Sequence, residues 1–560
     1  MAWQDYADKH TNTPAIFVSI AFNSGTRYYS NDYWRLAGTC YKGKILNFPQ
    51  IRSSVGDIKR TYERNKIIIV FDDSDYEFRE LEDTETVAFK NRTVTISIYF
   101  QDDNYTSGLT IFTGQIFDWE RLENLRYALY IEEESTNLDN EYPWKRVELT
   151  DYANAHETAI GWTIPIPYGS ISALGLSGDG AFGHPSLSSE GHGTGLPFVD
   201  TTVDSEKHLV GLQAAAITVD RVYKDGALQT AGAGNDYQIS TQVIDGFTHT
   251  EIHWEAGNRP TEANQISCDI TFGSRRPVEA IKHFLESFCG YAAGDFNAAS
   301  YNVAHDKETD RDYQMDGALW EKKTLRSILD VWRSEWELDI YWNKGGEICF
   351  NYLSSLLPAS INTYEDYLEI LEQFKSDPNV DKLINYIKYG YNFNYAKTYF
   401  YNYSEYEDTD SQTKYGGTFK AFEGFNWIRN STVAQDIAAR KIIRFKDPIV
   451  FDLMKFPLKT YSDDLTDYLK ITHFLGLGDG GYDEKLFQIR DTQYNLNDFT
   501  NEMLLEDVSN FAGAACILGD GDVLPATWAL AVGAQRDYCY LCDATTGQFS
   551  DGEPGKKLLD

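Results

Sequence analysis

The sequence predicts a mainly β, multidomain protein with α+β segments, in which antiparallel β-barrel domains are joined by a small helix-hairpin domain. Three observations support this class. At 560 residues the chain is too long for one hydrophobic core. Tyrosine (38) and phenylalanine (31) are abundant while methionine is rare (4), a bias toward residues that favour strands. Short apolar runs of alternating character, separated by Gly- and Asn-containing turns, recur along most of the chain.

Residues 1–168 are expected to form a first β-barrel domain. The clearest alternation is "VTISIYF", which places Val94, Ile96, Ile98 and Phe100 on one face of a strand. The run "KIIIVF" at 66–71 is continuously apolar after its lysine, which predicts a strand that is buried on both faces. Both runs favour a sheet-based domain.

Residues 169–276 are expected to hold a long loop followed by an inserted β domain. The stretch 169–200 is rich in Gly and Ser and has almost no periodic apolar signal, which indicates a loop or linker. Strands joined by Asp-Gly and other Gly-containing turns come after it and end near Arg276.

A small α+β domain is expected over residues 277–365. Pro277 opens a helix that Gly290 stops, and a second helix begins after Thr324. The sequence "LDIYWNKGGEICFNY" then predicts a hairpin with its turn at 343–346.

Residues 366–510 are expected to form a second β-barrel domain crossed by a helix at 431–445, which Pro448 prevents from continuing. Residues 511–560 are expected to form a small C-terminal β appendage.

An aromatic stripe, "YGYNFNYAKTYFYNY" at 389–403, is the most unusual local feature of the sequence. Its period of two predicts two strands of a hairpin with the turn at 396–398, and two aromatic rows that pair across it. The stripe can serve as a sugar-binding platform if its rings are exposed, or as a buried contact between sheets or subunits. We favour an interface, with seven candidate residues: Tyr389, Tyr391, Phe393, Tyr395, Tyr399, Tyr401 and Tyr403.

The charge of the chain argues against partners that carry phosphate. With 85 acidic side chains against 50 basic ones, the formal net charge is −35, which disfavours stable nucleic-acid binding and docking to an anionic membrane. No window approaches ~18 uninterrupted apolar residues, so we expect synthesis in a cytoplasm and no membrane crossing by this chain itself. The seven cysteines are scattered and unlike a disulfide framework.

No motif predicts catalysis or a cofactor. On a strand, His249, Glu251 and His253 of "HTEIH" would share one face as a zinc set does, but no further ligand is evident and we interpret them as an ordinary solvated strand face. "CYLC" (Cys539, Cys542), with Cys516 upstream, lacks a second pair at zinc-ribbon spacing. "GLSGDG" at 175–180 breaks the nucleophile-elbow pattern, and "LGLGDGG" lacks the Lys and Ser/Thr of a phosphate-binding loop.

Several stretches, taken in order, are similar to pieces of one protein family. They are "YYSNDYWRLAGTCYKGKILNFPQIRSSVGDIKR", "IFTGQIFDW" with Phe112, Gly114 and Ile116, "IPIPYGSIS", "LPFVDT", "ITVDRVYKDGAL", "PVEAIKHFLESFCGY", "TLRSILDVWRSEWELDIYWNKGGEICFNY", "INYIKYGYN", "DSQTKYGG" and "VAQDIAARKIIRFKDP". Over about 25–510 the chain resembles the central hub, or tail-tip, protein of tailed bacteriophages, a family related in fold to contractile-tail baseplate hubs and to gene transfer agent tail hub proteins.

The resemblance implies a structural virion protein at the tail tip, present in the host cytoplasm during assembly, and no enzyme. Three copies would close the distal end of the tail tube, with hub β-barrels at 1–168 and 366–510, and acidic side chains would line a channel for DNA ejection. It implies contacts with a distal tail or tail tube protein, the tape-measure protein and a tail fibre or spike, with transient DNA passage and only indirect contact with the host membrane. Some relatives hold an iron–sulfur cluster on cysteines. Here only Cys516, Cys539 and Cys542 are near neighbours in sequence, and we expect no cofactor.

A different class of function stays open. Tyrosine and tryptophan on β-surfaces also stack on sugars, so the chain can be a carbohydrate-binding or glycoside-cleaving receptor-interaction protein of the tail. Glycoside cleavage requires a cleft with two carboxylates ~5–10 Å apart beside exposed aromatic side chains.

Overall fold

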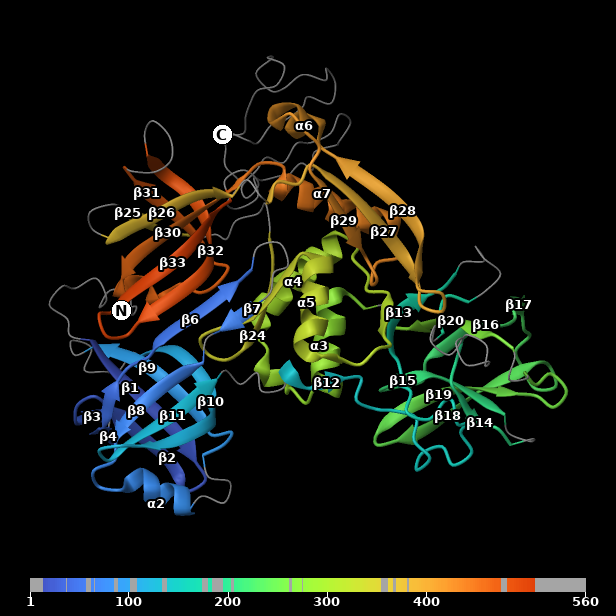
Figure 1. Cartoon of the computed structure of the whole chain (residues 1–560), viewed down its shortest axis with the longest axis horizontal. Helices are drawn as coiled ribbons and strands as arrows, with labels where there is room; N and C mark the ends of the chain where they lie inside the picture. The colour runs from blue at the N-terminus through green and yellow to red at the C-terminus, as the bar shows by residue number, and fades with distance from the viewer. Residues whose placement is uncertain are drawn as a thin grey trace, which may run out of the picture.

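The computed structural model describes residues 14–508 with internal gaps (Figure 1). The positions outside the description are 1–13, 37, 57–61, 65, 85–88, 101–107, 133–137, 174–179, 184–194, 203–205, 261–263, 274, 354–360, 366–368, 380–381, 475–480 and 509–560. The described chain is mainly β, with several sheets and few helices, which confirms the predicted class. None of the helices in the described ranges is long and apolar enough to cross a membrane.

The N-terminal unit is built on one sheet with the strand order β3-β4-β2-β1-β9-β10-β11-β8-β5. Its strands are β1 (Pro14–Phe22), β2 (Gly25–Ser30), β3 (Trp34–Leu36), β4 (Thr39–Gly43), β5 (Ile45–Asn47), β8 (Ile67–Asp72), β9 (Thr93–Phe100), β10 (Leu109–Leu122) and β11 (Arg126–Glu132). Along β9 every second residue is buried, as its alternation predicts. Within the described residues the pairings form an open path that ends on β3 and β5, so closure into a barrel stays a prediction.

Strand β8 differs from its prediction. Ile67, Ile69 and Phe71 are buried, whereas Ile68 between them is 43% exposed. The strand pairs with β11 on one side and β5 on the other, and only one of its faces meets the core that it shares with α2 (Glu77–Thr84). The expectation of burial on both faces is therefore wrong, because β8 belongs to an antiparallel sheet with one covered face.

One strand of the N-terminal region completes a sheet at the other end of the chain. β6 (Gln50–Val55) pairs antiparallel with β32 (Tyr482–Asn495), and β7 (Tyr62–Arg64) pairs with β6. Ile51 lies opposite Tyr494 in this register, and both are buried in the N-terminal core. As a consequence, the N- and C-terminal β units are neighbours in space. Figure 1 shows both at its left, with the C-terminal unit above the N-terminal one.

The inserted β region occupies the right of Figure 1 and holds a five-stranded and a four-stranded sheet. The first has the order β17-β16-β20-β13-β21 and the second β14-β15-β19-β18. Their strands are β13 (Ile166–Ile171), β14 (Phe198–Asp200), β15 (Lys207–Gln213), β16 (Thr218–Lys224), β17 (Ala227–Leu228), β18 (Tyr237–Ile244), β19 (Phe247–Trp254), β20 (Ile266–Phe272) and β21 (Gly317–Leu319).

The Gly- and Ser-rich stretch is anchored to this region. Phe182 is buried and forms a bridge with Cys268 of β20. Asp269, also fully buried, accepts hydrogen bonds from the backbone N–H groups of Ala173 and Ala181 at 2.9 and 3.0 Å. The described parts of 169–200 are therefore packed against a sheet, which the low apolar content of the stretch did not predict.

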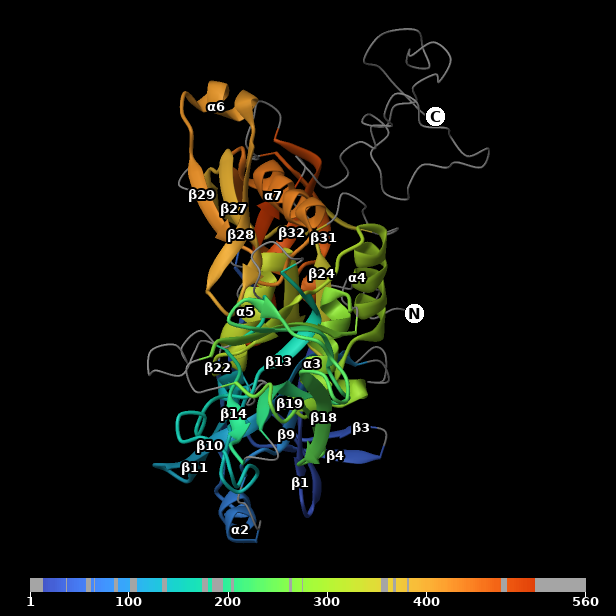
Figure 2. The ribbon, with the colours of Figure 1, turned by 90° about the vertical axis from the view of Figure 1, so that its right-hand side faces the viewer.

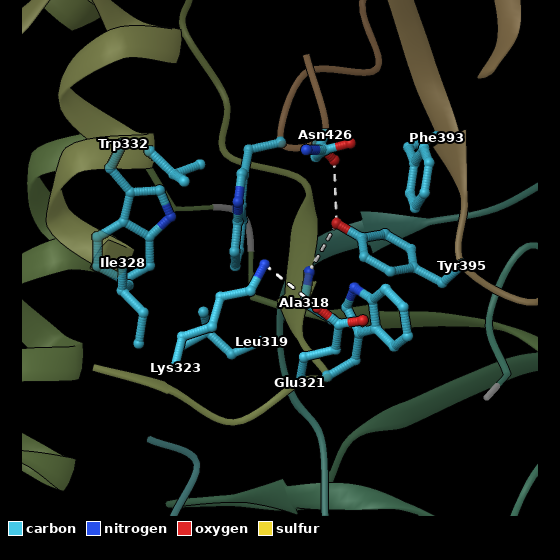
Figure 3. A pocket seen from close by; sticks show the side chains of 12 residues that line it. Ala318, Leu319, Glu321, Lys323, Ile328, Trp332, Phe393, Tyr395 and Asn426 are labelled. Atoms are coloured by element: carbon cyan, nitrogen blue, oxygen red, sulfur yellow. Dashed lines mark hydrogen bonds and ion pairs between the residues drawn. The ribbon is translucent and has the colours of Figure 1, made fainter. Parts of the chain in front are cut away.

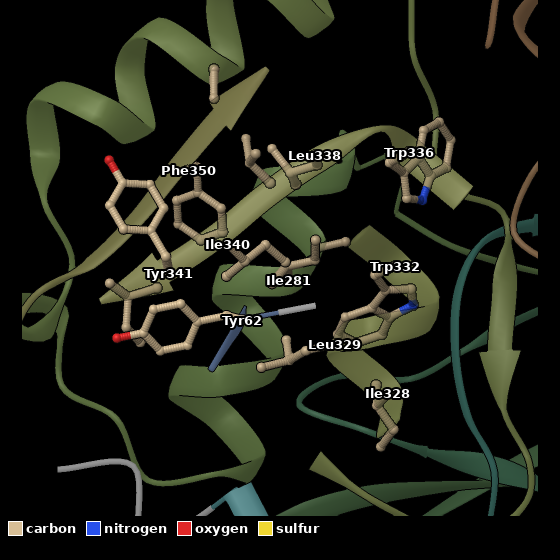
Figure 4. Close-up of a cluster of buried hydrophobic side chains, with 14 of the residues drawn as sticks. Tyr62, Ile281, Ile328, Leu329, Trp332, Trp336, Leu338, Ile340, Tyr341 and Phe350 are labelled. Atoms are coloured by element: carbon tan, nitrogen blue, oxygen red, sulfur yellow. The ribbon is translucent and has the colours of Figure 1, made fainter. Parts of the chain in front are cut away.

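A compact α+β unit occupies the centre of the molecule. Its elements are α3 (Pro277–Phe288), α4 (Ala298–Asp310), the short pair β12 (Glu141–Tyr142) and β22 (Lys323–Thr324), α5 (Leu325–Trp336), and the hairpin β23 (Leu338–Trp342) and β24 (Ile348–Tyr352). Figure 4 shows Ile281 of α3 and Leu329 of α5 packed with Ile340 of the hairpin, and Tyr62 of β7 enters the same cluster. The two helices and the hairpin are confirmed, whereas α4 was not predicted.

The C-terminal unit combines a large sheet, a small sheet and a helix. The large sheet has the order β25-β31-β32-β33-β30-β26, with β6 and β7 added beside β32. Its strands are β25 (Asn362–Glu365), β26 (Glu372–Asn379), β30 (Ile449–Pro457), β31 (Tyr468–His473), β32 and β33 (Thr500–Asp507). The helix α7 (Ser431–Phe445) matches its predicted range, and Asn430 caps its first turn. The domain boundaries drawn from the sequence, including the appendage at 511–560 outside the described residues, stay predictions.

Candidate functional site

The aromatic stripe forms the predicted hairpin. β27 (Tyr386–Asn394) pairs antiparallel with β28 (Tyr399–Glu407), and β29 (Lys420–Gly424) lies parallel on the other side of β27. The helix α7 covers one face of this three-stranded sheet. Figure 2 shows the sheet, α7 and the short helix α6 (Thr409–Tyr415) toward one end of the molecule and α2 at the other.

The two aromatic rows do not pair across the hairpin, so that part of the prediction is wrong. Tyr391 lies opposite Asn402, and Tyr399 lies opposite Asn394. The register joins odd positions of β27 to even positions of β28, so Phe393 and Phe400 form the one aromatic pair of the stripe that faces across the two strands.

The seven candidate interface residues divide by exposure. Tyr389 and Tyr395 are 2% and 1% exposed and are buried by contacts within the chain. Tyr391, Phe393 and Tyr401 are half-buried, whereas Tyr399 and Tyr403 are 37% and 54% exposed. A contact between subunits stays a prediction. The exposed aromatic surface that such a contact would use belongs mainly to Tyr399 and Tyr403.

Tyr395 joins three parts of the chain through hydrogen bonds. Its hydroxyl accepts from the backbone N–H of Ala318 at 3.0 Å and donates to the carbonyl of Asn426 at 2.9 Å. Its own backbone N–H donates to the carbonyl of Ala181 at 2.9 Å. Because the ring is also buried, which raises the pKa of Tyr395, the residue acts as a neutral structural bridge.

A pocket of about 120 Å³ opens beside this bridge, between α5, the β21–β22 segment and the end of β27 (Figure 3). Its lining residues are Ala318, Leu319, Trp320, Glu321, Lys323, Ile328, Val331, Trp332, Phe393, Tyr395, Asn426 and Trp427. The volume is close to the ~150 Å³ of an engineered protein cavity that binds benzene, so the pocket holds about one small ring. Glu321 and Lys323 form an exposed ion pair at 3.3 Å.

Trp332 forms the buried side of the pocket. Among the described residues, no conventional acceptor pairs with the indole N–H of Trp332, whose side chain is fully buried. Figure 3 shows this ring nitrogen turned toward the other lining residues. The Trp332 ring meets the ring of Trp427 nearly at right angles, with the ring centroids 5.4 Å apart. Because the indole nitrogen has no accessible surface, a molecule in the pocket does not reach it.

Glu335 supports one wall of the pocket. Its carboxylate accepts a hydrogen bond from the backbone N–H of Trp427 at 3.0 Å. Burial raises the pKa of Glu335 to about 8, and the backbone hydrogen bonds from Trp427 and Asn426 together with Lys441 offset only part of the rise. The position of this wall is therefore linked to a carboxyl group that titrates near neutral pH.

An aromatic track leads from the pocket onto the outer face of the sheet. Ring centroids are 5.1 Å apart between Tyr395 and Phe393, 5.1 Å between Phe393 and Phe400, and 6.0 Å between Phe400 and Tyr403. Phe400 lies over Gly390, where an added Cβ would come within 2.6 Å of the ring. Phe422 of β29, on the same outer face, is 60% exposed.

The "HTEIH" residues lie on β19, but the face is not solvated as predicted. His249 and Glu251 are 0% and 1% exposed. His249 Nδ1 lies 2.6 Å from the Tyr152 hydroxyl, and Lys207 pairs with Glu251 at 3.0 Å. Burial lowers the pKa of His249 to about 4, so the ring is neutral. The two side chains are buried because β19 is covered on both faces. Ile252 and Trp254 pack into the core on one face, and Tyr152 covers His249 on the other.

Neither metal ligation nor catalysis gains support in the described residues. Among them no cluster of three or more His, Cys, Asp or Glu side chains is placed to hold a metal. Cys268, Cys289 and Cys349 are buried, whereas Cys516, Cys539 and Cys542 lie outside the description, as does most of "GLSGDG" and "LGLGDGG". Glu321 supplies the one carboxylate among the described lining residues of the pocket, and glycoside cleavage needs two.

Comparisons with known proteins give weak likenesses. No protein-family model matches the chain, and no curated protein matches it either. A tail protein from Neisseria meningitidis MC58 aligns at TM-score 0.37 and 8% identity, covering 89% of this chain and 98% of that one. The 43 kDa tail protein of prophage MuSo2 from Shewanella oneidensis aligns at TM-score 0.35 and 7% identity, covering 89% and 99%. A chain of a native gene transfer agent virion aligns at TM-score 0.36 and 9% identity, covering 65% and 88%. TM-scores and identities this low establish neither a shared fold nor a function.

Proposed function

We propose that the chain is a structural protein of a bacteriophage tail, and that three copies form the hub that closes the distal end of the tail tube. The observation that carries the proposal is the pairing of β6 with β32, which fixes two mainly β units side by side in one chain. Three such chains would present six mainly β units, a number that suits a sixfold tail tube.

The family-like stretches lie on elements that fit this role. "IFTGQIFDW" lies on β10, where Phe112 and Ile116 are buried. Gly114 between them leaves no room for a side chain, because an added Cβ would lie 2.3 Å from the carbonyl oxygen of Glu132. These residues pack the N-terminal sheet and support a scaffolding role.

The charge supports a channel function in the assembled ring. A net charge of −35 repels DNA, so acidic side chains that face the lumen would let DNA pass without being held. In this proposal the hub contacts the distal tail or tail tube protein and the tape-measure protein, and it carries a fibre or spike. The same assembly would place the chain in the virion, at the tail tip.

Mass photometry of the purified chain, with electron microscopy of particles that contain it, tests the proposal. We expect a species of three times 63.8 kDa and a threefold density at the tail tip. A chain that stays monomeric at all concentrations and is absent from tails would refute the hub. A monomer that cleaves or binds surface glycans would favour the carbohydrate alternative instead.

A further inference from the structure

We propose that two copies of the chain pair edge to edge through strand β18, which joins their four-stranded sheets into one continuous sheet. The contact does not rest on the hub proposal, because it is two-fold and uses the inserted β region alone. Three observations carry it: the open edge of β18, its lack of charge and the self-complementary order of its side chains.

The hairpin turn fixes the direction in which the backbone groups of β18 point. The strand pairs with β19, and the turn between them holds Asp245 and Gly246 at φ values of 52° and 83°. Positive φ at both positions fits a type I′ turn, which is flanked by a hydrogen-bonded pair, here Ile244 and Phe247. Because hydrogen bonding alternates along antiparallel strands, the even-numbered residues of β18 bond to β19 and the odd-numbered ones point away.

The outward groups are open along most of the strand. The carbonyl of Tyr237 accepts a hydrogen bond from the N–H of Gly232 at 2.8 Å, on the side away from β19, which agrees with this direction. The next outward groups belong to Ile239, Thr241 and Val243, and no backbone partner for them occurs in the described part of the chain. Three residues therefore offer both a donor and an acceptor to an added strand.

β18 lacks the features that usually keep edge strands from pairing with other chains. Its eight residues contain no charged side chain, no proline and no glycine, and its register with β19 has no bulge. Natural edge strands are commonly short, charged or bulged. The other edge strands of the described sheets have fewer than five residues, carry charged side chains or are buried. In a chain with a net charge of −35, an uncharged edge lets two copies approach with little local repulsion.

The order of side chains along β18 selects a second copy as the added strand. Antiparallel pairing about a two-fold axis at Thr241 places each Thr241 opposite its counterpart, and Ile239 opposite Val243 of the second copy. Ile239 and Val243 are 40% and 71% exposed, so the contact would cover apolar surface. On the other face, Ser240 lies opposite Gln242 of the second copy, so polar side chains meet polar ones.

The same pairing extends an existing core. Ile239 lies opposite Ile252 of β19, which is fully buried in the core of the inserted β region. At the end of the strand, Asp245 would face Tyr237 of the second copy. Asp245 pairs with Lys145 at 2.6 Å, which compensates its charge.

Analytical ultracentrifugation of the full chain, up to about 100 μM, tests the contact. We expect a species of twice 63.8 kDa, or of six chains where the threefold ring also forms. Thr241→Lys and Thr241→Glu each place two like charges opposite each other at the axis, and we expect the association constant of each variant to fall at least about ten-fold. An equimolar mixture of the two variants should pair again, because lysine then faces glutamate.

Thr218 provides the matched control. This threonine is exposed on β16, which is paired on both sides in the neighbouring sheet. Thr218→Lys and Thr218→Glu should pair as the parent does, separately and when mixed. If the charged Thr241 variants do not fold, Thr241→Pro gives a second readout: it removes an outward N–H that the single chain does not use, so it should fold but not pair.

Several outcomes would overturn the proposal. A parent without two-chain or six-chain species up to about 100 μM would leave the edge to a strand of another protein. Parent-like pairing of both charged Thr241 variants, or a mixture of them that does not pair, would place any contact elsewhere. Three-chain species without pairs of chains would retain the hub and reject this contact, whereas pairs without three-chain or six-chain species would do the reverse.

Discussion

Arg444 of α7 and Glu506 of β33 form a fully buried, two-pronged ion pair. The guanidinium Nε and Nη2 donate to the two carboxylate oxygens at 2.9 and 2.8 Å. Arg490 donates to the same carboxylate and contacts Asp339 of β23 at 3.2 Å. This network links the large C-terminal sheet and the helix α7 to the central hairpin, so it crosses the boundary between the domains predicted at 277–365 and 366–510.

We expect Glu506→Gln to destabilise the chain by about 3–5 kcal/mol at neutral pH, because it leaves buried guanidinium groups without their counter-ion. Burial alone would raise the pKa of Glu506, but Arg444 and Arg490 outweigh burial and lower it from 4.5 to about 2. The stabilising contribution is present above pH 4.5 and is lost as the pH falls toward 2, so the difference from the parent should shrink there.

Urea unfolding at several pH values measures this difference. Glu484→Gln is the matched control, since Glu484 pairs with Lys470 at the surface and should cost little. Equal stability of the Glu506→Gln variant and the parent at pH 7 would contradict the assigned role of the network.

Glu335 should make stability depend on pH in the opposite direction. Its pKa is raised by burial from 4.5 to about 8, so its contribution is full below pH 4.5 and is lost as the pH rises toward 8. Glu335→Gln cannot ionise and keeps an acceptor for the N–H of Trp427. Relative to the parent, the variant should therefore gain stability between pH 5 and pH 9, by an amount on the order of a few kcal/mol.

Thermal unfolding of both proteins across this pH range tests the gain. Glu279→Gln, at a partly exposed position in an i,i+4 pair with Arg275, provides the comparison and should show no comparable trend. A parent-to-variant difference that stays constant with pH would mean that Glu335 does not titrate in this range.

The junction between the two β units should depend on Ile51. This side chain is fully buried at the β6–β32 pairing, whereas Ile68 of β8 is 43% exposed. We expect Ile51→Ala to lower the free energy of unfolding by about 2–5 kcal/mol and Ile68→Ala by much less. Denaturant unfolding and limited proteolysis measure both effects, and similar losses in the two variants would show that the junction does not stabilise the chain.

Local signals in the sequence predicted the helices α3, α5 and α7 well, because each has a terminal signal and an apolar face. The helix α4 was missed because its described buried side chains are Ala304 and Glu308, so no apolar stripe marks it. Glu308 is buried because its carboxylate accepts the N–H of Val278 at the start of α3, at 3.0 Å. Such a contact depends on tertiary packing and has no periodic signature.

The candidate site was only partly predictable for the same reason. The period of two identified the hairpin of the stripe, but which rings face each other depends on the register that the turn sets. The pocket needs Trp320 and Trp332 together with Trp427, which lies far from both in the sequence and which no local pattern connects to them. The domain interfaces built by β6 and by Arg490 likewise arise only in the folded chain.

The stripe itself should separate into structural and interface residues. Tyr389 is buried between the sheet and the core that includes α7, so Tyr389→Ala should cost about 3–5 kcal/mol of folding free energy. Tyr403 is 54% exposed, so Tyr403→Ser should leave the stability of the single chain nearly unchanged. If the stripe also joins subunits, the Tyr403→Ser variant should still fold but form fewer trimers in mass photometry. A stability loss as large as that of Tyr389→Ala would contradict the exposed position of Tyr403.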